Sequence, residues 1–373
     1  MNKFKFYFIL LLAGIAIVSC NKKSDDEVVT VPLRDYKEQY AADQDSIVKY
    51  LKTNYIQEVT ADFDIKFAKI PAGGTQTSIW DQTTYPLQER QVYSNDVTYT
   101  VYYLITNEGS GSAPTNTDKI FASYTGYLLN NSSFDSSNGI PVAFNLFSGA
   151  NENTVIEGWS EIFPKFKTGT SVFPVPSDGV ITYSGYGAGA MFLPSGLGYF
   201  GTSTSAIPVY SPLVFTFKLF DLQRMDNEYR LNASTGLPEF IGDGIPDYLE
   251  DINKDGYLYD LRNKTKYPNP PDHLLGDDTD GDGIADFLDI DDDGDGYTTL
   301  FEITKPDYDQ DPAISGLSKY YPFDPVQDNP RTPNYDETER LGIPAFSASG
   351  TPDYTSPGRL RLHLDKDHYK AKP

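Results

Sequence analysis

A patterned acidic segment places the strongest constraint on how this chain can fold. Residues 240–311 contain 21 Asp and Glu against 5 Lys and Arg, a net charge of −16 within a total of −23. The carboxylates recur at alternate positions before glycines, in GDGIPDYLEDINKDGY (242–257) and, 39 residues later, in GDGIADFLDIDDDGDGY (281–297). Close carboxylates repel one another, so a compact form of this segment requires cations.

The spacing is typical of calcium-binding loops, in which alternate side chains face one ion and a glycine permits the tight turn. An EF-hand-like loop has Gly296 at position 6 and ligands at positions 1, 3, 5, 7 and 12, namely Asp291, Asp293, Asp295, the Tyr297 carbonyl and Glu302. A second loop resembles the thrombospondin type 3 calcium repeat and comprises Asp278, Asp280, Asp282, Asp286 and Asp289. A third, weaker loop comprises Asp251, Asn253, Asp255 and the Tyr257 carbonyl, assisted by Asp243 and Asp247.

We therefore expect an irregular module stabilised by two to four structural calcium ions. The alternative is a solubilising acidic linker, which would place carboxylates without a fixed relation to the glycines. Here glycine follows the loop aspartates at repeated places, which favours calcium. Extracellular calcium modules bind at about 10⁻⁴–10⁻³ M, whereas Mg²⁺ retains its waters and prefers fewer protein ligands.

Composition limits the partners of the chain. The negative charge excludes nucleic acid and anionic lipid as partners recognised by charge. Aromatic residues make up 14%, including 28 Tyr and 22 Phe, which is too many for a disordered chain. A length of 373 residues fits several domains rather than one core.

Five aromatic-rich phrases precede the acidic segment in a fixed order: FASYTGYLLN (121–130), FDSS (134–137), TVIEGWSE (154–161), FLPSGLGYFG (192–201) and IPVYSPLVFTFKL (207–219). In this order and spacing they resemble the FKBP-type peptidyl-prolyl cis-trans isomerase domain, over about residues 97–222. The resemblance implies an α+β fold in which an antiparallel sheet wraps on a short helix. It also implies catalysis without a cofactor, on proline-containing segments of other proteins.

The residue types suit that reaction. Rotation about an X–Pro bond crosses a barrier of about 18–20 kcal/mol because amide resonance is lost. A water-poor apolar pocket disfavours the charge-separated resonance form, and a few hydrogen bonds hold the twisted bond. The resemblance implies a floor made by Trp159 and walls made by Tyr124, Phe134, Val155, Ile156, Ile207 and Phe215. It further implies that the Ile156 N–H and the Tyr199 hydroxyl bind substrate carbonyls and that Asp135 orients the polar side.

Several positions depart from the family pattern. Val142 stands where a wall phenylalanine is common, Thr154 replaces a common glutamate, and Phe200 follows Tyr199 where glycine is usual. The stretch between Gly169 and Phe192 is also longer than usual. Two hypotheses follow. The first is a catalytic isomerase, and the second is a non-catalytic surface lipoprotein that binds proline-containing segments, which Val142 and Phe200 would favour if they closed the pocket. For Phe144, Leu146, Phe163 and Phe166 we expect packing roles alone.

The N-terminus predicts export and lipid anchoring. A basic start is followed by an apolar run of 13 residues at 6–18, which is too short to span a membrane and suits a signal peptide. Cys20, the only cysteine, follows Ile17–Val18–Ser19 as in a bacterial lipoprotein box, which predicts its lipidation. The sequence NKKSDDE (21–27) resembles a surface-export signal of Bacteroidetes lipoproteins. We expect an outer-membrane lipoprotein that faces either the cell surface or the periplasm.

Apolar residues at steps of three, four and seven predict a helix over 33–57, either a cap on the sheet or a dimerisation arm. The expected organisation is a signal peptide at 1–19, a tether at 20–32, an N-terminal helix and cap at 33–96, the FKBP-like domain at 97–222, acidic calcium repeats at 223–311 and a Pro/Tyr/Asn-rich region at 312–373. Protein substrates, oligomeric state and the role of the last region are not predicted.

Overall fold

A computed structural model of the chain describes residues 32–147, 149, 154–171, 181–306, 318–325, 341–347 and 349–368. The chain divides into two compact units, residues 1–34 and 35–373. The predicted signal peptide, the lipidation site at Cys20 and most of the tether lie outside the described residues. Within the described residues, none of the helices combines the length and the apolar character needed to span a membrane.

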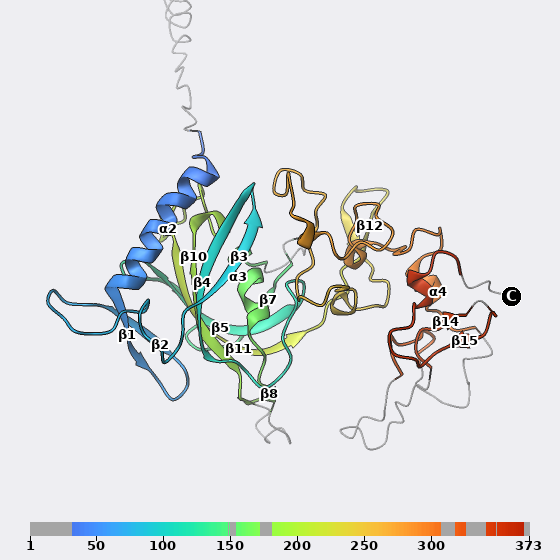
Figure 1. Ribbon diagram of the computed structural model, residues 1–373, viewed down its shortest axis with the longest axis horizontal. Coiled ribbons are helices and arrows are strands. Elements are labelled where there is room, and N and C mark those ends of the chain that lie inside the picture. The colour runs from blue at the N-terminus through green and yellow to red at the C-terminus, as the bar shows by residue number, and fades with distance from the viewer. Residues whose placement is uncertain are drawn as a thin grey trace, which may run out of the picture. The chain divides into compact units, whose positions relative to one another are not determined.

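A mostly antiparallel α+β architecture confirms the expected fold class (Figure 1). Among the described residues, seven strands form one sheet in the order β3-β4-β10-β11-β5-β6, with β7 also paired to β5. The bounds are β3 Gln88–Ser94, β4 Val97–Asn107, β5 Lys119–Leu128, β6 Ser133–Ser136, β7 Val142–Asn145, β10 Gly187–Leu193 and β11 Leu213–Gln223. The sheet therefore begins before residue 97, and the expected domain boundary falls in the turn between β3 and β4.

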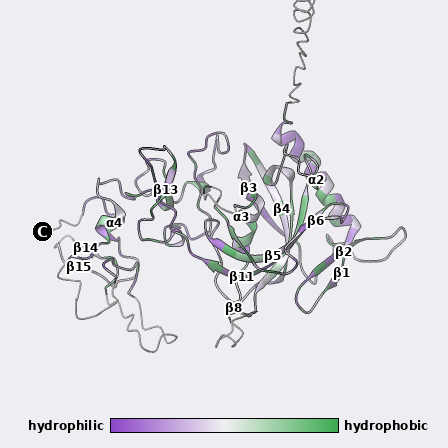
Figure 2. Ribbon diagram, turned by 180° about the vertical axis from the view of Figure 1, so that it is seen from behind, coloured by the Kyte–Doolittle hydropathy of each residue, from purple (hydrophilic) through white to green (hydrophobic). Residues whose placement is uncertain are grey.

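Both faces of this sheet are covered, because successive strand residues point to opposite sides. One face packs on the short helix α3 (Glu157–Ile162), with Tyr99, Met191 and Phe215 among the buried residues of that cluster. The other face packs on α2 (Tyr36–Thr53), and its cluster contains Tyr102, Phe192 and Val214. Figure 2 shows hydrophobic segments along the strands of this sheet.

Helix α2 is shorter than the predicted 33–57. Asp35 caps its first turn by accepting from the N–H groups of Lys37 and Glu38 at 2.9 and 3.0 Å. At the other end Asn54 donates both its backbone N–H and its side-chain amide to the Tyr50 carbonyl, which ends the helix. Residues beyond Thr53 continue as a strand instead.

Helix α2 packs on the sheet of its own chain, which is the arrangement expected of a cap. The buried Asp43 carboxylate accepts from the Ser195 backbone N–H at 2.7 Å and from the Ser195 hydroxyl at 2.6 Å. The Tyr40 hydroxyl accepts from the Thr100 N–H of β4 at 2.8 Å. These contacts lock α2 to the loop that follows β10 and to the sheet itself.

The remaining strands and the last α-helix of the described residues are short, and only β12, β13 and α4 lie in the predicted acidic repeats at 223–311. These short elements are β1 Asn54–Val59, β2 Ile65–Lys69, β8 Thr170–Ser171, β9 Tyr183–Ser184, β12 Tyr229–Leu231, β13 Pro238–Phe240, α4 Thr299–Glu302, β14 Ala345–Phe346 and β15 Pro352–Asp353. Described parts of the C-terminal region pack on the acidic segment. Tyr321, Ile343 and Leu362 form one buried cluster with Ile245 and Ile303, so this region completes a core.

Candidate active site

Trp159 on α3 lies at the centre of a cluster of aromatic side chains. It is 4% exposed, and its ring centroid lies 5.0 Å from Tyr124, 5.2 Å from Phe215 and 5.3 Å from Phe144. These three rings meet it edge-on, at interplanar angles of 76°, 85° and 72°. Aromatic rings prefer such edge-to-face contacts, so Trp159 is held in one orientation.

The other predicted walls belong to the same cluster. Ile207 and Phe215 are buried, while Phe134, Val155 and Ile156 are partly buried against it. Phe134 meets Phe215 edge-on at 5.6 Å. Gly126 makes this contact possible, because a Cβ there would lie 2.4 Å from the Phe134 ring. The structure thus brings the predicted apolar residues into one site.

The polar side of the pocket is a tyrosine–carboxylate pair. The Tyr124 hydroxyl on β5 donates to Asp135 Oδ2 on β6 at 2.5 Å, and Asp135 Oδ1 accepts from the Ser136 N–H at 2.8 Å. Burial, and then the hydrogen bond to Asp135, raise the pKa of Tyr124. Burial and the charge of Asp135 also raise the pKa of Tyr199. Tyr199 therefore lies within electrostatic reach of this pair and keeps its proton as a donor.

The residues singled out as departures do not fill this pocket. Phe200 has φ +45°, the region that favours glycine. Its ring stacks on Tyr36 of α2 at 4.0 Å and meets Tyr210 edge-on at 5.1 Å. Val142 on β7 is 37% exposed. The Phe200 ring is therefore engaged by the N-terminal helix, and this contact offsets its unfavourable backbone conformation.

Phe144 is partly buried and packs against the core cluster, in agreement with the expected packing role. Its ring contacts both Trp159 at 5.3 Å and Tyr124 at 5.8 Å, and it lies two residues along β7 from Val142. Leu146, Phe163 and Phe166 are fully buried, in agreement with packing roles.

The other face of α3 is bound to the acidic segment. Glu161, 2% exposed, pairs with Arg90 of β3 at 2.6 Å and accepts from the Tyr259 hydroxyl at 3.2 Å. The Tyr257 hydroxyl donates to the Glu161 backbone carbonyl at 2.8 Å, and the Arg90 guanidinium lies 3.3 Å from the centre of the Tyr257 ring. The helix that carries Trp159 is thus held by residues directly after the loop at 251–256.

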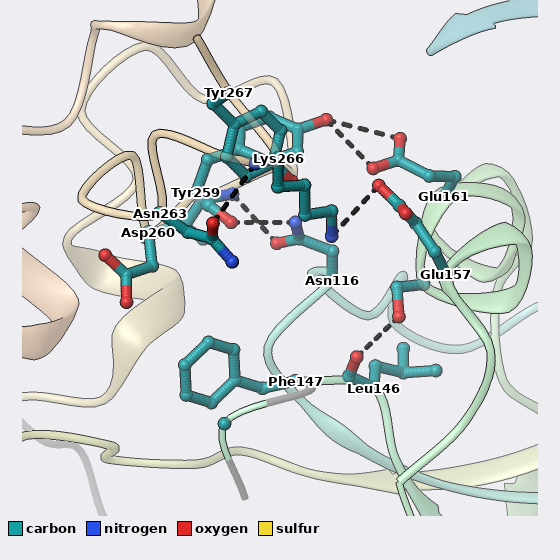
Figure 3. A pocket seen from close by; sticks show the side chains of 13 residues that line it. Asn116, Leu146, Phe147, Glu157, Glu161, Tyr259, Asp260, Asn263, Lys266 and Tyr267 are labelled. Carbon is teal, nitrogen blue, oxygen red and sulfur yellow. Dashed lines mark hydrogen bonds and ion pairs between the residues drawn. The ribbon is translucent and has the colours of Figure 1, made fainter. Parts of the chain in front are cut away.

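A cavity of about 180 Å³ lies beside this junction, and Figure 3 shows the side chains that line it. Lys266 pairs with Glu157 at 3.0 Å across it, and Asn116 exchanges two hydrogen bonds of 2.8 Å with the Leu258 backbone. Burial raises the pKa of Glu157, and Lys266 opposes that shift. Charged and amide groups line the cavity together with apolar and aromatic side chains, among them Phe147, Tyr259 and Tyr267.

The three predicted calcium loops share one backbone geometry. In each, the carboxylate at position 1 accepts from the glycine N–H at position 6: Asp251 from Gly256 at 2.8 Å, Asp278 from Gly283 at 3.0 Å and Asp291 from Gly296 at 3.0 Å. The position-3 side chain accepts from the N–H at position 5, and the position-5 side chain from the N–H at position 7. The glycines have φ of +86°, +95° and +93°, so only glycine fits without strain.

Carboxylate oxygens converge in two of these loops. One oxygen from each of Asp278, Asp280 and Asp282 lies within 4.8 Å of the others, and Asp291, Asp293 and Asp295 do the same. Glu302 is 1% exposed, and burial with the charges of Asp293 and Asp295 raises its pKa to about 9. Hard oxygen ligands at this spacing fit Ca²⁺.

Four predicted residues have further contacts. Asp286 accepts from the Thr279 N–H and hydroxyl at 2.8 and 2.6 Å, and Asp289 accepts from the Ile290 N–H at 2.7 Å. Asp243 groups with Asp226 and Glu228, and Asp247 groups with Glu228 and Glu250. The sequence reasoning missed Asp226, Glu228, Glu250 and Asp292, although the 39-residue repeat aligns Glu250 with Asp289.

Comparison with known proteins supports two assignments. Residues 110–220 match the family model of the FKBP-type peptidyl-prolyl cis-trans isomerase, and residues 242–334 match a family model described as BamM C-terminal. The chain is 30% identical over 123 residues to the FKBP-type 22 kDa peptidyl-prolyl cis-trans isomerase of Escherichia coli K12, which is 32% of this chain and 48% of that protein. It is 32% identical over 124 residues to FkpA of Aeromonas hydrophila, an FKBP-type peptidyl-prolyl cis-trans isomerase, covering 33% of this chain and 38% of that one.

A solved structure gives a similar match in sequence. The crystal structure of FkpA from Escherichia coli is 28% identical, covers 33% of this chain and 48% of that chain, and has a TM-score of 0.26. The matched part thus spans less than half the length of these curated relatives.

Proposed function

We propose that this chain, whose residues 110–220 form an FKBP-type peptidyl-prolyl cis-trans isomerase domain, accelerates the rotation of X–Pro bonds in other proteins. The observation that carries the proposal is the pocket itself. A buried tryptophan floor is enclosed by aromatic rings, with one tyrosine–carboxylate pair at its side. This is the arrangement that the chemistry of amide rotation requires.

The reaction follows from the residues that line the pocket. The proline ring lies on Trp159, and the surrounding rings exclude water from the amide. In water the charge-separated resonance form stabilises the planar amide. An apolar surface solvates this form poorly, so the free-energy difference between the planar and the twisted amide becomes smaller. No bond is made or broken, and neither a nucleophile nor a cofactor takes part.

Hydrogen bonds to the substrate would come from two donors. Among the described residues, the Ile156 N–H at the start of α3 has no hydrogen-bond acceptor, so it is free to bind a substrate carbonyl. The Tyr199 hydroxyl, on a side chain that is 36% exposed, would bind a second carbonyl. Asp135 would keep the Tyr124 hydroxyl turned away from the substrate. A hydrogen-bonded backbone on both sides of the proline would fix the chain while the X–Pro bond rotates.

The structure favours catalysis over the binding-only alternative. Closure of the pocket by Val142 and Phe200 would favour that alternative. The Phe200 ring is stacked on Tyr36, and Val142 is exposed on β7. The floor and the walls remain those of an isomerase site.

We further propose that the chain is an outer-membrane lipoprotein, anchored through Cys20, that acts on exported proteins. Support for this comes from the signal-like N-terminus and the single cysteine at its end. We also propose that the acidic segment binds structural Ca²⁺ through the loops at 251–257, 278–289 and 291–302. Support comes from the repeated loop geometry and from the close carboxylate oxygens.

The isomerase proposal is tested by a protease-free prolyl isomerisation assay on the soluble chain from Asp25. The variant Trp159→Ala, Asp135→Ala removes the floor and the polar side, and Tyr248→Phe on the acidic segment serves as a matched aromatic control. We expect activity in the parent and the control and its loss in the double variant. Equal rates in all three proteins, on several X–Pro peptides, would contradict catalysis and leave a binding module.

A further inference from the structure

A second group of carboxylates is distinct from the ligand sets predicted for the three calcium loops, and four of its five members are buried. It comprises Asp226, Glu228, Asp243, Glu250 and Asp292, which come from three segments of the chain. Glu228 is 0% exposed, Asp243 is 1% and Glu250 is 5%. Their oxygens converge: one from each of Asp226, Glu228 and Asp243 lies within 4.8 Å of the others, and the same holds for Asp243, Glu250 and Asp292.

Several of these oxygens have no hydrogen-bond partner among the described residues. Both oxygens of Glu250 are buried without a donor, and so are Glu228 Oε1 and Asp243 Oδ2. A buried carboxylate without a hydrogen bond or a counter-ion is strongly destabilising. Here the unpartnered oxygens of three acidic side chains are directed into one group, where a bound cation would compensate their charge.

The backbone around this group reproduces the geometry of the calcium loops. The Gly244 N–H donates to Asp226 Oδ2 at 3.1 Å, as the position-6 glycine does to position 1 in the three continuous loops. The Asp243 N–H donates to Glu228 Oε2 at 3.2 Å, as position 5 does to position 3. The Ile245 N–H donates to Asp243 Oδ1 at 2.8 Å, as position 7 does to position 5. Gly244 has φ +98°, close to the other loop glycines.

The hydrogen bonds at loop positions 2 and 9 are also the same in the buried group and in a continuous calcium loop. In the loop at 278–289, Asp286 accepts from the Thr279 N–H and side chain, and its own N–H donates to the Asp277 carbonyl at 2.8 Å. In the buried group, Asp247 accepts from the Asn227 N–H and side chain, and its N–H donates to the Met225 carbonyl at 3.0 Å. Asp247 is thus held as Asp286 is, and Glu250 stands at position 12.

We propose that residues 226–228 and 243–250 form a fourth, discontinuous cation loop that binds one Ca²⁺. Residues 229–242, which carry the β12–β13 hairpin, occupy the place of the single residue between positions 3 and 5. Asp226, Glu228, Asp243 and Glu250 bind the ion, and Asp292 reaches it from the last continuous loop. Oxygen-only ligands with several carboxylates select a hard divalent cation, and the number of ligands favours Ca²⁺ over Mg²⁺.

The position of this site gives it a different role from the others. Asp226 comes three residues after the end of β11, the last strand of the isomerase sheet. An ion bound here would therefore connect the segment that follows β11 to both halves of the acidic repeat. The proposal rests on the cation chemistry proposed for the three continuous loops and is independent of isomerase activity.

Counting bound calcium tests the fourth site directly. The full chain in detergent is studied by native mass spectrometry at millimolar Ca²⁺, as the parent and as Glu228→Gln, Glu250→Gln, which keeps side-chain size but removes two charges. Asp280→Asn, in a continuous loop, and Glu239→Gln, on the exposed hairpin, are the matched controls. We expect the double variant to lose one ion, Asp280→Asn to lose another, their combination to lose two, and Glu239→Gln to lose none.

Thermal unfolding distinguishes the loss of a calcium site from a general loss of folding in the double variant. With Ca²⁺ the double variant should unfold below the parent, and in chelator it should unfold at or above the parent, because two repelling buried charges are gone. A full ion count in the double variant would overturn the fourth site alone. Loss of stability in both conditions would assign these residues to packing, and a parent that binds no Ca²⁺ would overturn the whole cation proposal.

Discussion

Removal of Arg90 should expose how strongly the acidic segment holds helix α3. In Arg90→Met the Glu161 carboxylate, 2% exposed, would keep only the Tyr259 hydroxyl at 3.2 Å as a partner. Breaking a buried pair in this way typically costs about 3–5 kcal/mol. The lost contact with the Tyr257 ring adds about 0.5–2 kcal/mol. Since Arg90 keeps 15% side-chain exposure, we expect a total loss of about 3–5 kcal/mol.

The assay is urea unfolding of the calcium-saturated chain, followed by tryptophan fluorescence. Arg230→Met is the matched control, because its pair with Glu239 is 62% and 46% exposed and such pairs contribute about 0–1 kcal/mol. Adding Glu161→Gln to Arg90→Met should restore part of the stability, since the uncompensated charge is then gone. A loss below about 1 kcal/mol for Arg90→Met, or no recovery in the double variant, would refute this account of the junction.

Three further changes have defined outcomes. Asp43→Ala leaves the buried Ser195 N–H and hydroxyl without their acceptor, so the free energy of unfolding should fall by about 1–3 kcal/mol in urea titrations. Gly126→Ala would force a Cβ to 2.4 Å from Phe134, so kcat/KM for an X–Pro peptide should fall at least about tenfold, and an unchanged value would show that the wall is not tight. In chelator the stability should fall as pH rises from 6 to 9, because burial raises the pKa of Asp247 to about 7 and of Asp243 to about 8. The contribution of these two protonated carboxyl groups to folding stability is complete below their pKa in the unfolded chain and is lost as pH rises through their pKa values in the folded chain. Melting temperatures in chelator that rise with pH would contradict this.

Both site predictions were based on local patterns in the sequence. The predicted pocket residues lie in five short sequence segments. The family resemblance implies where each segment lies in the fold, as a strand end, a turn or a helix. The continuous calcium loops are also local, because their ligands are spaced two residues apart. Neither prediction required knowledge of which distant segments meet.

The features that the sequence did not reveal all depend on distant contacts. Asp226 and Glu228 are separated from Asp243 by a hairpin, so their loop cannot be recognised from spacing. Arg90 meets Tyr257 across more than 160 residues. The direction of the Phe200 ring depends on Tyr36 of α2. Helix α2 ends before its apolar pattern does, because Asn54 caps it with two hydrogen bonds.

The central claim is that the acidic segment, when it holds calcium, supports the helix that carries the floor of the isomerase pocket. The most direct measurement is the X–Pro isomerisation rate of the soluble chain from Asp25, in Ca²⁺ and in chelator, as temperature is raised. We predict that activity in chelator is lost at a lower temperature than in Ca²⁺, and that Tyr257→Ala narrows this difference. Identical temperature profiles in Ca²⁺ and chelator would contradict the claim.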